Sequence, residues 1–372
     1  MVDSMNIVTT TNEEVVILQP RQIWKDWNTL RKNTLKPYYQ TYIKDICWSP
    51  CGTYLVSCDT QHQLTIWNTT NITTTTSKKE QPTKVQYTKN VPIFHQLQFY
   101  TSNDRLYLIC ASTMGIYFYN WKTLLSSSSS TTMLEEPLFA LTSSSSLMEQ
   151  SQFCIVANLC IATGRNGQVL LWDIATQQLQ SIISQNHFSS LSTIHSLDSP
   201  HQIILTGCPT TTNNGTTVMA SIWDVSQSKL MDTISTTSTT SSSSTINCMA
   251  WDKSDWMVGG GNGFLATIHL PTRTMNSCRK TRESISNVIL YNHTIYSVGN
   301  EGVISSWDTT THLSSSSSPN RAWLSTPSAT TLASSSNNNS LVVGGKGTSL
   351  DWFIIPPHTT TSFGTKSHIL TL

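Results

Sequence analysis

The chain has 372 residues, of which only 12% are charged, and its 22 Lys and Arg almost balance its 21 Asp and Glu. A net charge of +1 creates no field that would attract a phosphate backbone, so direct nucleic-acid binding is not expected. No stretch approaches the roughly 20 apolar residues of a membrane span, and residues 1–12 lack the pattern of a secretory signal. These features predict a soluble, intracellular protein.

The cysteines of the sequence fit this compartment. Their number is odd, no two form a Cys-x-x-Cys pair, and most lie in apolar, strand-like runs where a thiol behaves as a small hydrophobe. We therefore expect reduced thiols and neither a metal ion nor another cofactor. The nine positions are Cys47, Cys51, Cys58, Cys110, Cys154, Cys160, Cys208, Cys248 and Cys278.

Residues 1–36 are predicted to form an N-terminal arm. Apolar side chains at Ile23, Trp24, Trp27 and Leu30 follow the spacing of one helix face, so the pattern predicts a short amphipathic helix. Trp24 and Trp27 on that face are candidate partner-binding residues, since two exposed Trp side chains would form an interaction patch. In the alternative interpretation the helix packs on the body of the protein.

The rest of the chain, residues 37–372, repeats one phrase. Residues 166–173 (Asn-Gly-Gln-Val-Leu-Leu-Trp-Asp) read as a tight turn and a strand with an aromatic residue near its end, and similar phrases recur along the chain. The phrases are spaced 39 to 53 residues apart. A recurrence of roughly 40 to 45 residues, with units that end in Trp-Asp or a remnant of it, is typical of a WD-repeat β-propeller. Seven markers predict an all-β, seven-bladed WD-repeat β-propeller with a short N-terminal helical arm: Trp67, Tyr119, Trp172, Trp223, Ile268, Trp307 and Phe353.

Each repeat unit divides into strand-like runs separated by turn residues. In the first unit, residues 43–48, 54–58 and 64–67 are expected strands, and Pro50 and Gly52 mark the first turn. Ser and Thr tracts, such as residues 236–245, fall only between expected strands and are expected to be loops on the rim. Either residues 15–18 or residues 369–372 are expected to supply the outer strand of the last blade and so to close the ring, because open sheet edges invite aggregation.

Turns at the ends of blades are the expected place for partner binding, because rigid scaffolds carry function on their loops. Four turn residues between second and third strands should share one face of the ring: His62, Arg165, Asn300 and Lys346.

No catalytic pattern stands out in the sequence. There is no Gly-rich phosphate loop, no Gly-x-Ser-x-Gly motif and no His-x-x-x-His pair, so the protein is not expected to be an enzyme. Asp252 and Asp255 form the one carboxylate pair of note, and a hydrolase built on them is a minor alternative. Many WD repeats carry a His, Ser or Thr, Asp and Trp hydrogen-bond set, for which His187, Thr206 and Trp223 are partial candidates.

The fifth and sixth units carry a closer resemblance. Residues 254–261 (Ser-Asp-Trp-Met-Val-Gly-Gly-Gly), with residues 288–291, 295–299 and 303–307, resemble the THO complex subunit 6 family of WD-repeat proteins. Residues 49–55 (Ser-Pro-Cys-Gly-Thr-Tyr-Leu) resemble its first repeat.

The resemblance implies a non-catalytic subunit of the THO part of the transcription-export (TREX) assembly, which couples transcription to mRNA processing and nuclear export. It implies nuclear localisation, coiled-coil partner subunits (subunits five and seven), and only indirect contact with RNA. The alternative within the same fold is another WD-repeat adaptor, such as a ubiquitin-ligase substrate receptor or a reader of histone tails.

Overall fold

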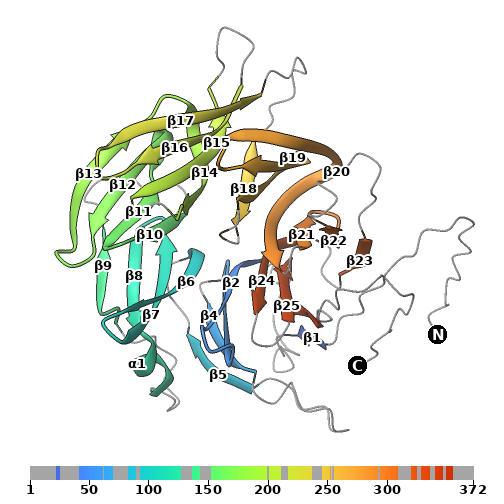
Figure 1. Cartoon of the computed structure of the whole chain (residues 1–372). Helices are drawn as coiled ribbons and strands as arrows, with labels where there is room; N and C mark the ends of the chain where they lie inside the picture. Colours follow the sequence, from blue (N-terminus) through green and yellow to red (C-terminus); the bar gives the residue numbers. More distant parts are fainter. Residues whose placement is uncertain are drawn as a thin grey trace, which may run out of the picture.

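The computed structural model shows sheets set in a ring around a central axis, with the strands following one another around the ring in chain order (Figure 1). The structure describes residues 22–25, 42–61, 63–69, 83–88, 93–126, 136–142, 152–198, 201–210, 217–236, 245–251, 253, 255–291, 294–308, 320–324, 328–335, 340–346 and 349–354.

Four of the sheets are regular antiparallel units of four strands. Within each sheet the first strand in the chain lies nearest the axis, and the next three follow outwards in chain order. Their strands are β2 (Ile43–Trp48), β3 (Tyr54–Asp59), β4 (Leu64–Asn68) and β5 (Thr83–Thr88); β6 (Phe94–Ser102), β7 (Arg105–Ser112), β8 (Gly115–Asn120) and β9 (Phe139–Leu141); β10 (Phe153–Val156), β11 (Leu159–Thr163), β12 (Gln168–Asp173) and β13 (Gln178–Ser184); and β14 (Phe188–Ser196), β15 (Gln202–Pro209), β16 (Thr217–Asp224) and β17 (Lys229–Thr236).

The next sheet has six strands and corrects the prediction of seven blades, because the described strands form six sheets. Its members are β18 (Ile246–Trp251), β19 (Trp256–His269), β20 (Thr274–Tyr291), β21 (Thr294–Gly299), β22 (Val303–Asp308) and β23 (Asn320–Trp323). Two of the expected units are joined here, because β20 runs unbroken through 18 residues. That stretch contains no Gly or Pro to interrupt the hydrogen-bonded ladder.

Packing within the six-stranded sheet explains why the sequence suggested two units. Val258 and Leu265 of β19 belong to the same buried cluster as Ile295 of β21 and Trp307 of β22. The sheet therefore bends so strongly that its two halves bury apolar side chains against each other. The repeat of the sequence survives in the packing, whereas the strand β20 runs from one repeat into the next and pairs with β19 up to Ser284 and with β21 from Ile285.

The last sheet contains both ends of the described chain and closes the ring. Its order is β1 (Gln22–Lys25), β26 (Ser349–Ile354), β25 (Ser340–Gly345) and β24 (Ala329–Ser335). Strand β1 pairs antiparallel with β26, and Ile23 lies opposite Asp351. Among the described residues, closure uses β1, and the two expected segments, residues 15–18 and 369–372, lie outside that part of the chain.

The same strand overturns the predicted N-terminal helix. Ile23 and Trp24 lie in β1, in extended backbone, and Trp27 lies outside the described residues. The apolar spacing suited a helix, but pairing with β26 covers a sheet edge that would otherwise expose its backbone groups. The α-helix that the described residues do form is a single short one, α1 (Trp121–Ser126). There, the Asn120 side chain caps the first turn by accepting from the amide of Lys122 at 3.0 Å.

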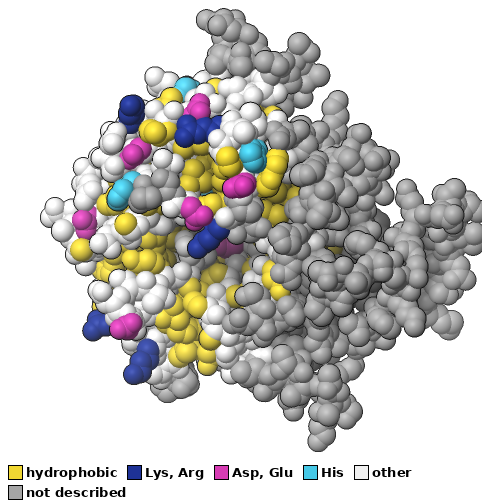
Figure 2. All heavy atoms as spheres, viewed as in Figure 1, with side chains coloured by type: hydrophobic (Ala, Val, Ile, Leu, Met, Phe, Trp, Pro, Cys, Tyr) yellow, Lys and Arg dark blue, Asp and Glu magenta, His cyan; other side chains and the backbone are white. Residues whose placement is uncertain are grey.

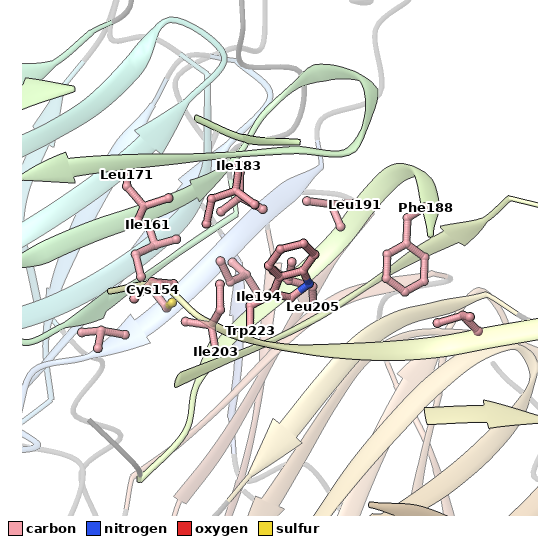
Figure 3. Close-up of a cluster of buried hydrophobic side chains, with 14 residues drawn as sticks. Cys154, Ile161, Leu171, Ile183, Phe188, Leu191, Ile194, Ile203, Leu205 and Trp223 are labelled. Atoms are coloured by element: carbon pink, nitrogen blue, oxygen red, sulfur yellow. The ribbon is translucent and has the colours of Figure 1, made fainter. Parts of the chain in front are cut away.

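The core lies between neighbouring sheets. In the cluster shown in Figure 3, Ile161 and Leu171 of one sheet meet Ile194, Leu205 and Trp223 of the next. Full burial of one such side chain contributes about 1.5–3 kcal/mol. Because each sheet is covered by its two neighbours, the stability of every sheet depends on the ring being complete.

Some first and second strands of a sheet approach one another so closely that only glycine fits. Gly207 ends the buried part of β15, and a Cβ atom there would lie 2.0 Å from the carbonyl oxygen of Ser190. A Cβ atom at Gly345, at the matching place in β25, would lie at the same distance from the carbonyl oxygen of Ser328. The glycines of the second strands thus let the first strand of the sheet pass close by.

Substitution at Gly207 tests this close approach. We expect Gly207→Ala to lower the free energy of unfolding by more than about 2 kcal/mol, because backbone must move to admit the methyl group. Gly263→Ala is the matched control, since φ there is +78° but the nearest atom lies 3.4 Å away, and it should cost only about 1 kcal/mol. Chemical denaturation measures both, and equal losses would contradict the steric account.

Closure by β1 makes a second prediction. Deleting residues 1–25 should lower the melting temperature by several degrees more than deleting residues 1–20, because only the longer deletion removes β1 and exposes the edge of β26. Differential scanning calorimetry measures both proteins. Equal melting temperatures would show that β1 does not close the ring.

Candidate interaction face and central polar bridges

One end of the ring gathers the turns that the sequence marked for partner binding. The antiparallel register places the start of an innermost strand beside the end of the second strand, as with Ala329 opposite Gly345, and in the same way Ile285 within β20 lies opposite Gly299 at the end of β21. The turns that lead into the third strands lie at this same end. We call it the turn face, and its described members include Asn247, Asn262, Asn300, Glu301 and Lys346.

Two of the predicted site residues meet on the turn face. The Ser328 hydroxyl donates to Oδ1 of Asn300 at 3.3 Å, and the Lys346 amide donates to the Ser328 carbonyl oxygen at 2.7 Å. Asn300 comes from the six-stranded sheet and Lys346 from the closing sheet. The segment before β24 therefore brings two neighbouring sheets together here.

The other predicted site residues are placed less completely. Arg165 begins the short 3-10 helix η3 (Arg165–Gly167) in the turn before β12, and its side chain is outside the description. Trp24 lies in the backbone ladder of β1, whereas Trp27 and His62 fall outside the described residues. The role of all six residues in partner binding stays a prediction.

A polar network on the turn face was missed by the sequence analysis. Oδ1 of Asn262 accepts from Nδ2 of Asn247 at 3.1 Å and from the Ser284 hydroxyl at 2.7 Å. The Thr245 hydroxyl continues the network to Oδ1 of Asn247 at 3.2 Å. These side chains come from β19, β18, β20 and the residue before β18, so neutral amides and hydroxyls tie three strands of this sheet together at the turn face. An Asn-Gly turn at residues 262–263 was the only sequence signal for it.

The view in Figure 2 fits a weakly charged surface, because basic and acidic side chains occur as scattered spots among neutral and hydrophobic ones. Exposed large apolar side chains are few among the described residues. They are Met114, Leu138, Leu179, Ile182 and Met231.

Several of the inner strands carry a bulge, and polar side chains beside some of these bulges cross between sheets. Each extra residue breaks the pairing register and re-aims the side chains beside it. The bulges lie between Ile43 and Asp45, Phe94 and Gln96, Ile246 and Cys248, Ile285 and Asn287, and Ala329 and Thr331.

Asp45 makes the most extensive of these bridges. Its Oδ2 accepts from the Leu97 amide of β6 at 2.7 Å, and its Oδ1 accepts from the Thr331 hydroxyl of β24 at 2.9 Å. One carboxyl group thus joins the innermost strands of three sheets. Burial raises the pKa of Asp45 from 3.8 to about 6, and the hydrogen bonds from Leu97 and Thr331 oppose that rise.

Side chains at neighbouring positions extend the bridges around the axis. Gln96 accepts from the Phe153 amide at 2.6 Å and donates to the Phe153 carbonyl oxygen at 3.2 Å, which joins β6 to β10. Nε2 of His195 lies 3.1 Å from the Met249 carbonyl oxygen, which joins β14 to β18. Burial lowers the pKa of His195, so its imidazole is neutral near pH 7.

The Trp residues of the third strands are anchored by serines. Nε1 of Trp67 donates to Ser57 and Nε1 of Trp307 donates to Ser297, each at 3.1 Å from an adjacent strand. Nε1 of Trp172 has no hydrogen-bond partner among the described residues, and Ala162 stands where a serine would lie by register.

The predicted set of His187, Thr206 and Trp223 does not form. Nε1 of Trp223 donates to Ser221 at 3.1 Å, and the Thr206 hydroxyl donates to the Ile246 carbonyl oxygen at 3.2 Å. The amide of His187 is held by Gln185 instead. The serine that accepts the indole N–H can lie on the strand of the Trp, as with Ser221, or on the adjacent strand, as with Ser57. The sequence positions of the expected set therefore did not identify the partner of Trp223.

The thiols and carboxylates of the described residues form no recognisable reaction centre. Eight described cysteines are free thiols, and burial raises the pKa of Cys248 to about 12 and that of Cys154 further. No group of three or more His, Cys, Asp or Glu side chains in the described residues could hold a metal ion. Asp255 is exposed in its turn, and Asp252 lies outside the description. No helix in the described part is long and apolar enough to span a membrane.

Comparison with known proteins identifies the fold. No protein-family model matches the sequence, and no curated protein does. The crystal structure of the WD40 β-propeller domain of Doa1 is similar with a TM-score of 0.62, over 90% of this chain and 96% of that chain, at 12% sequence identity. The chain therefore has the WD40 β-propeller fold.

The Asp45 bridge predicts a pH dependence of stability. A folded-state pKa raised above 3.8 means that Asp45 stabilises the fold most below pH 4, and that this contribution is lost as pH rises through about 6. Asp45→Asn keeps an acceptor for Leu97 without the charge. Between pH 4 and pH 7 the free energy of unfolding of this variant should therefore fall by about 2–3 kcal/mol less than that of wild type.

Urea denaturation at several pH values measures the difference between the two proteins, in which every other titrating group cancels. Asp45→Ala is the companion variant, since it leaves the Leu97 amide without its acceptor and should be less stable than Asp45→Asn by about 1–3 kcal/mol at every pH. Parallel pH profiles for wild type and Asp45→Asn would contradict the bridge.

Proposed function

We propose that this protein is a non-catalytic scaffold subunit of the THO part of the transcription-export assembly in the nucleus. In this role the turn face of the propeller binds coiled-coil subunits of the assembly, and RNA is contacted only through them. The observation that carries the proposal is the resemblance of residues 254–261 and the strands that follow to THO complex subunit 6.

The packing of that segment explains why it contains three glycines. Met257 and Val258 are buried in β19, and glycines follow at 259, 260 and 261. A Cβ atom at Gly261 would lie 2.0 Å from the Thr245 carbonyl oxygen, and one at Gly260 would lie 2.7 Å from Ile285. These glycines are therefore required by close packing, as Gly344 and Gly345 are in the closing sheet.

The surface also suits a scaffold. Charged side chains make up 12% of the sequence and carry both signs, so the ring has no strong field for nucleic acid. Its turn face presents neutral amides and hydroxyls on rigidly held strands. Such a surface suits a protein partner bound by hydrogen bonds around a few anchoring side chains.

Affinity purification from nuclear extract followed by mass spectrometry tests the proposal. We expect THO coiled-coil subunits, five and seven among them, to co-purify with the full-length chain. Recovery of ubiquitin-ligase components or histones without any THO subunit would favour the alternative adaptors and overturn the proposal.

Variants show whether the turn face is the surface used. The double substitution Asn300→Arg and Lys346→Glu changes charge at the junction beside Ser328 and should reduce recovery of the coiled-coil subunits about tenfold or more. Arg105→Glu is the matched control, because Arg105 is the exposed first residue of β7, beside the turn between first and second strands at the opposite end of the ring. Equal recovery from both variants would move the binding surface elsewhere.

A further inference from the structure

Two small pockets lie at equivalent places in two repeats. The first is lined by Ser297, Ser305, Trp307 and Glu301 among others, in the six-stranded sheet. The second is lined by Ser57, Thr65, Trp67 and Asp59 among others, beside β3 and β4. Register makes the two sets correspond, since Ser297 lies opposite Ser305 as Ser57 lies opposite Thr65. In both repeats the pocket therefore lies beside a Trp of the third strand and the serine that accepts its indole N–H, Trp307 with Ser297 and Trp67 with Ser57.

The first pocket offers acceptors and one negative charge. The Ser297 oxygen takes the Trp307 indole N–H at 3.1 Å and keeps a second lone pair, while the Ser305 hydroxyl is a further acceptor. Glu301 stands exposed at the turn before β22, and within the described residues its carboxylate makes no hydrogen bond or ion pair. No Lys, Arg or His lines the pocket.

Size limits the ligand to the tip of a side chain. The cavity volume is about 40 Å³. A single water molecule needs roughly 10–15 Å³ on this measure, so the space holds about three waters. Drug-sized ligands and nucleotides require several hundred Å³. Ser297 and Trp307 are buried whereas Glu301 is exposed, so the pocket leads inwards from the turn face.

We propose that this pocket binds a primary ammonium group, the tip of a lysine side chain supplied by a protein partner. An ammonium has three N–H donors and no acceptor, which matches the oxygens of Ser297, Ser305 and Glu301. The carboxylate supplies the opposite charge, and the indole of Trp307 supplies an aromatic wall against which the methylene stem can pack.

The second pocket serves as an internal comparison. Its volume is about 20 Å³, enough for only one or two waters. Its carboxylate is already engaged, because Oδ1 of Asp59 accepts from the amides of Gln61 and Gln63 at 2.8 and 3.0 Å. The same Trp–Ser pair therefore offers less room and less free charge at this position.

Titration with n-butylammonium chloride tests the proposal on the full chain labelled with ¹⁵N-Trp. The indole N–H signal of Trp307, assigned with Trp307→Phe, should shift saturably, and that of Trp67 should not. Sodium chloride at equal ionic strength should leave both signals in place. A Trp307 shift that does not saturate, or that sodium chloride reproduces, would overturn the proposal.

Charge variants identify the carboxylate. Glu301→Gln should weaken n-butylammonium binding about threefold, as expected for an exposed ion pair, and Glu301→Lys should abolish it. Because Glu301 is exposed, neither variant should disturb the fold. Asp59→Asn is the matched control and should leave the affinity of the Trp307 site unchanged. Wild-type affinity in Glu301→Lys would refute the site, and none of these results depends on the THO proposal.

Discussion

The ring is held together at its centre by side chains that cross from one innermost strand to the next. The carboxyl group of Asp45 joins β2 to β6 and β24, Gln96 joins β6 to β10, and His195 joins β14 to β18. Apolar burial between sheets is stronger in total but non-directional. The polar bridges add direction, because each fixes the register of one sheet against its neighbour. Bulges beside Asp45 and Gln96 re-aim two of these side chains.

Much of the fold could be predicted from the sequence, because its signals are local. The turn at Pro50 and Gly52 and the apolar strands around it appear where expected, and Trp67, Trp172 and Trp307 lie in third strands. Such strands are bounded by residues that set the backbone angles of turns. The prediction of a propeller of the WD-repeat type is therefore confirmed.

Two features could not be obtained in this way. The six sheets depend on β20 continuing through Thr274–Tyr291, and the sequence hinted at it only through the absence of Gly and Pro and the shortest marker spacing, 39 residues from Ile268 to Trp307. The N-terminal strand depends on an edge of β26 more than 320 residues away. A helical spacing of apolar residues carries no information about such a partner.

The candidate site shows the same division. Asn300 and Lys346 could be assigned to one face because both follow second strands, and the structure places them around Ser328. The network of Asn247, Asn262 and Ser284 could not, since it joins three strands across the sheet. Similarly, the serine partners of Trp67 and Trp307 lie on neighbouring strands, so only the strand register identifies them.

Amide hydrogen exchange at Leu97 tests the central role of the bridges most directly. The Leu97 amide donates to Asp45 across two sheets, so its exchange requires the ring to separate at that point. The account predicts that this amide exchanges only through global unfolding in the wild-type protein, as slowly as the amides of buried β11. Exchange at the rate of an exposed turn would show that the sheets are not joined at the axis, and would contradict the account.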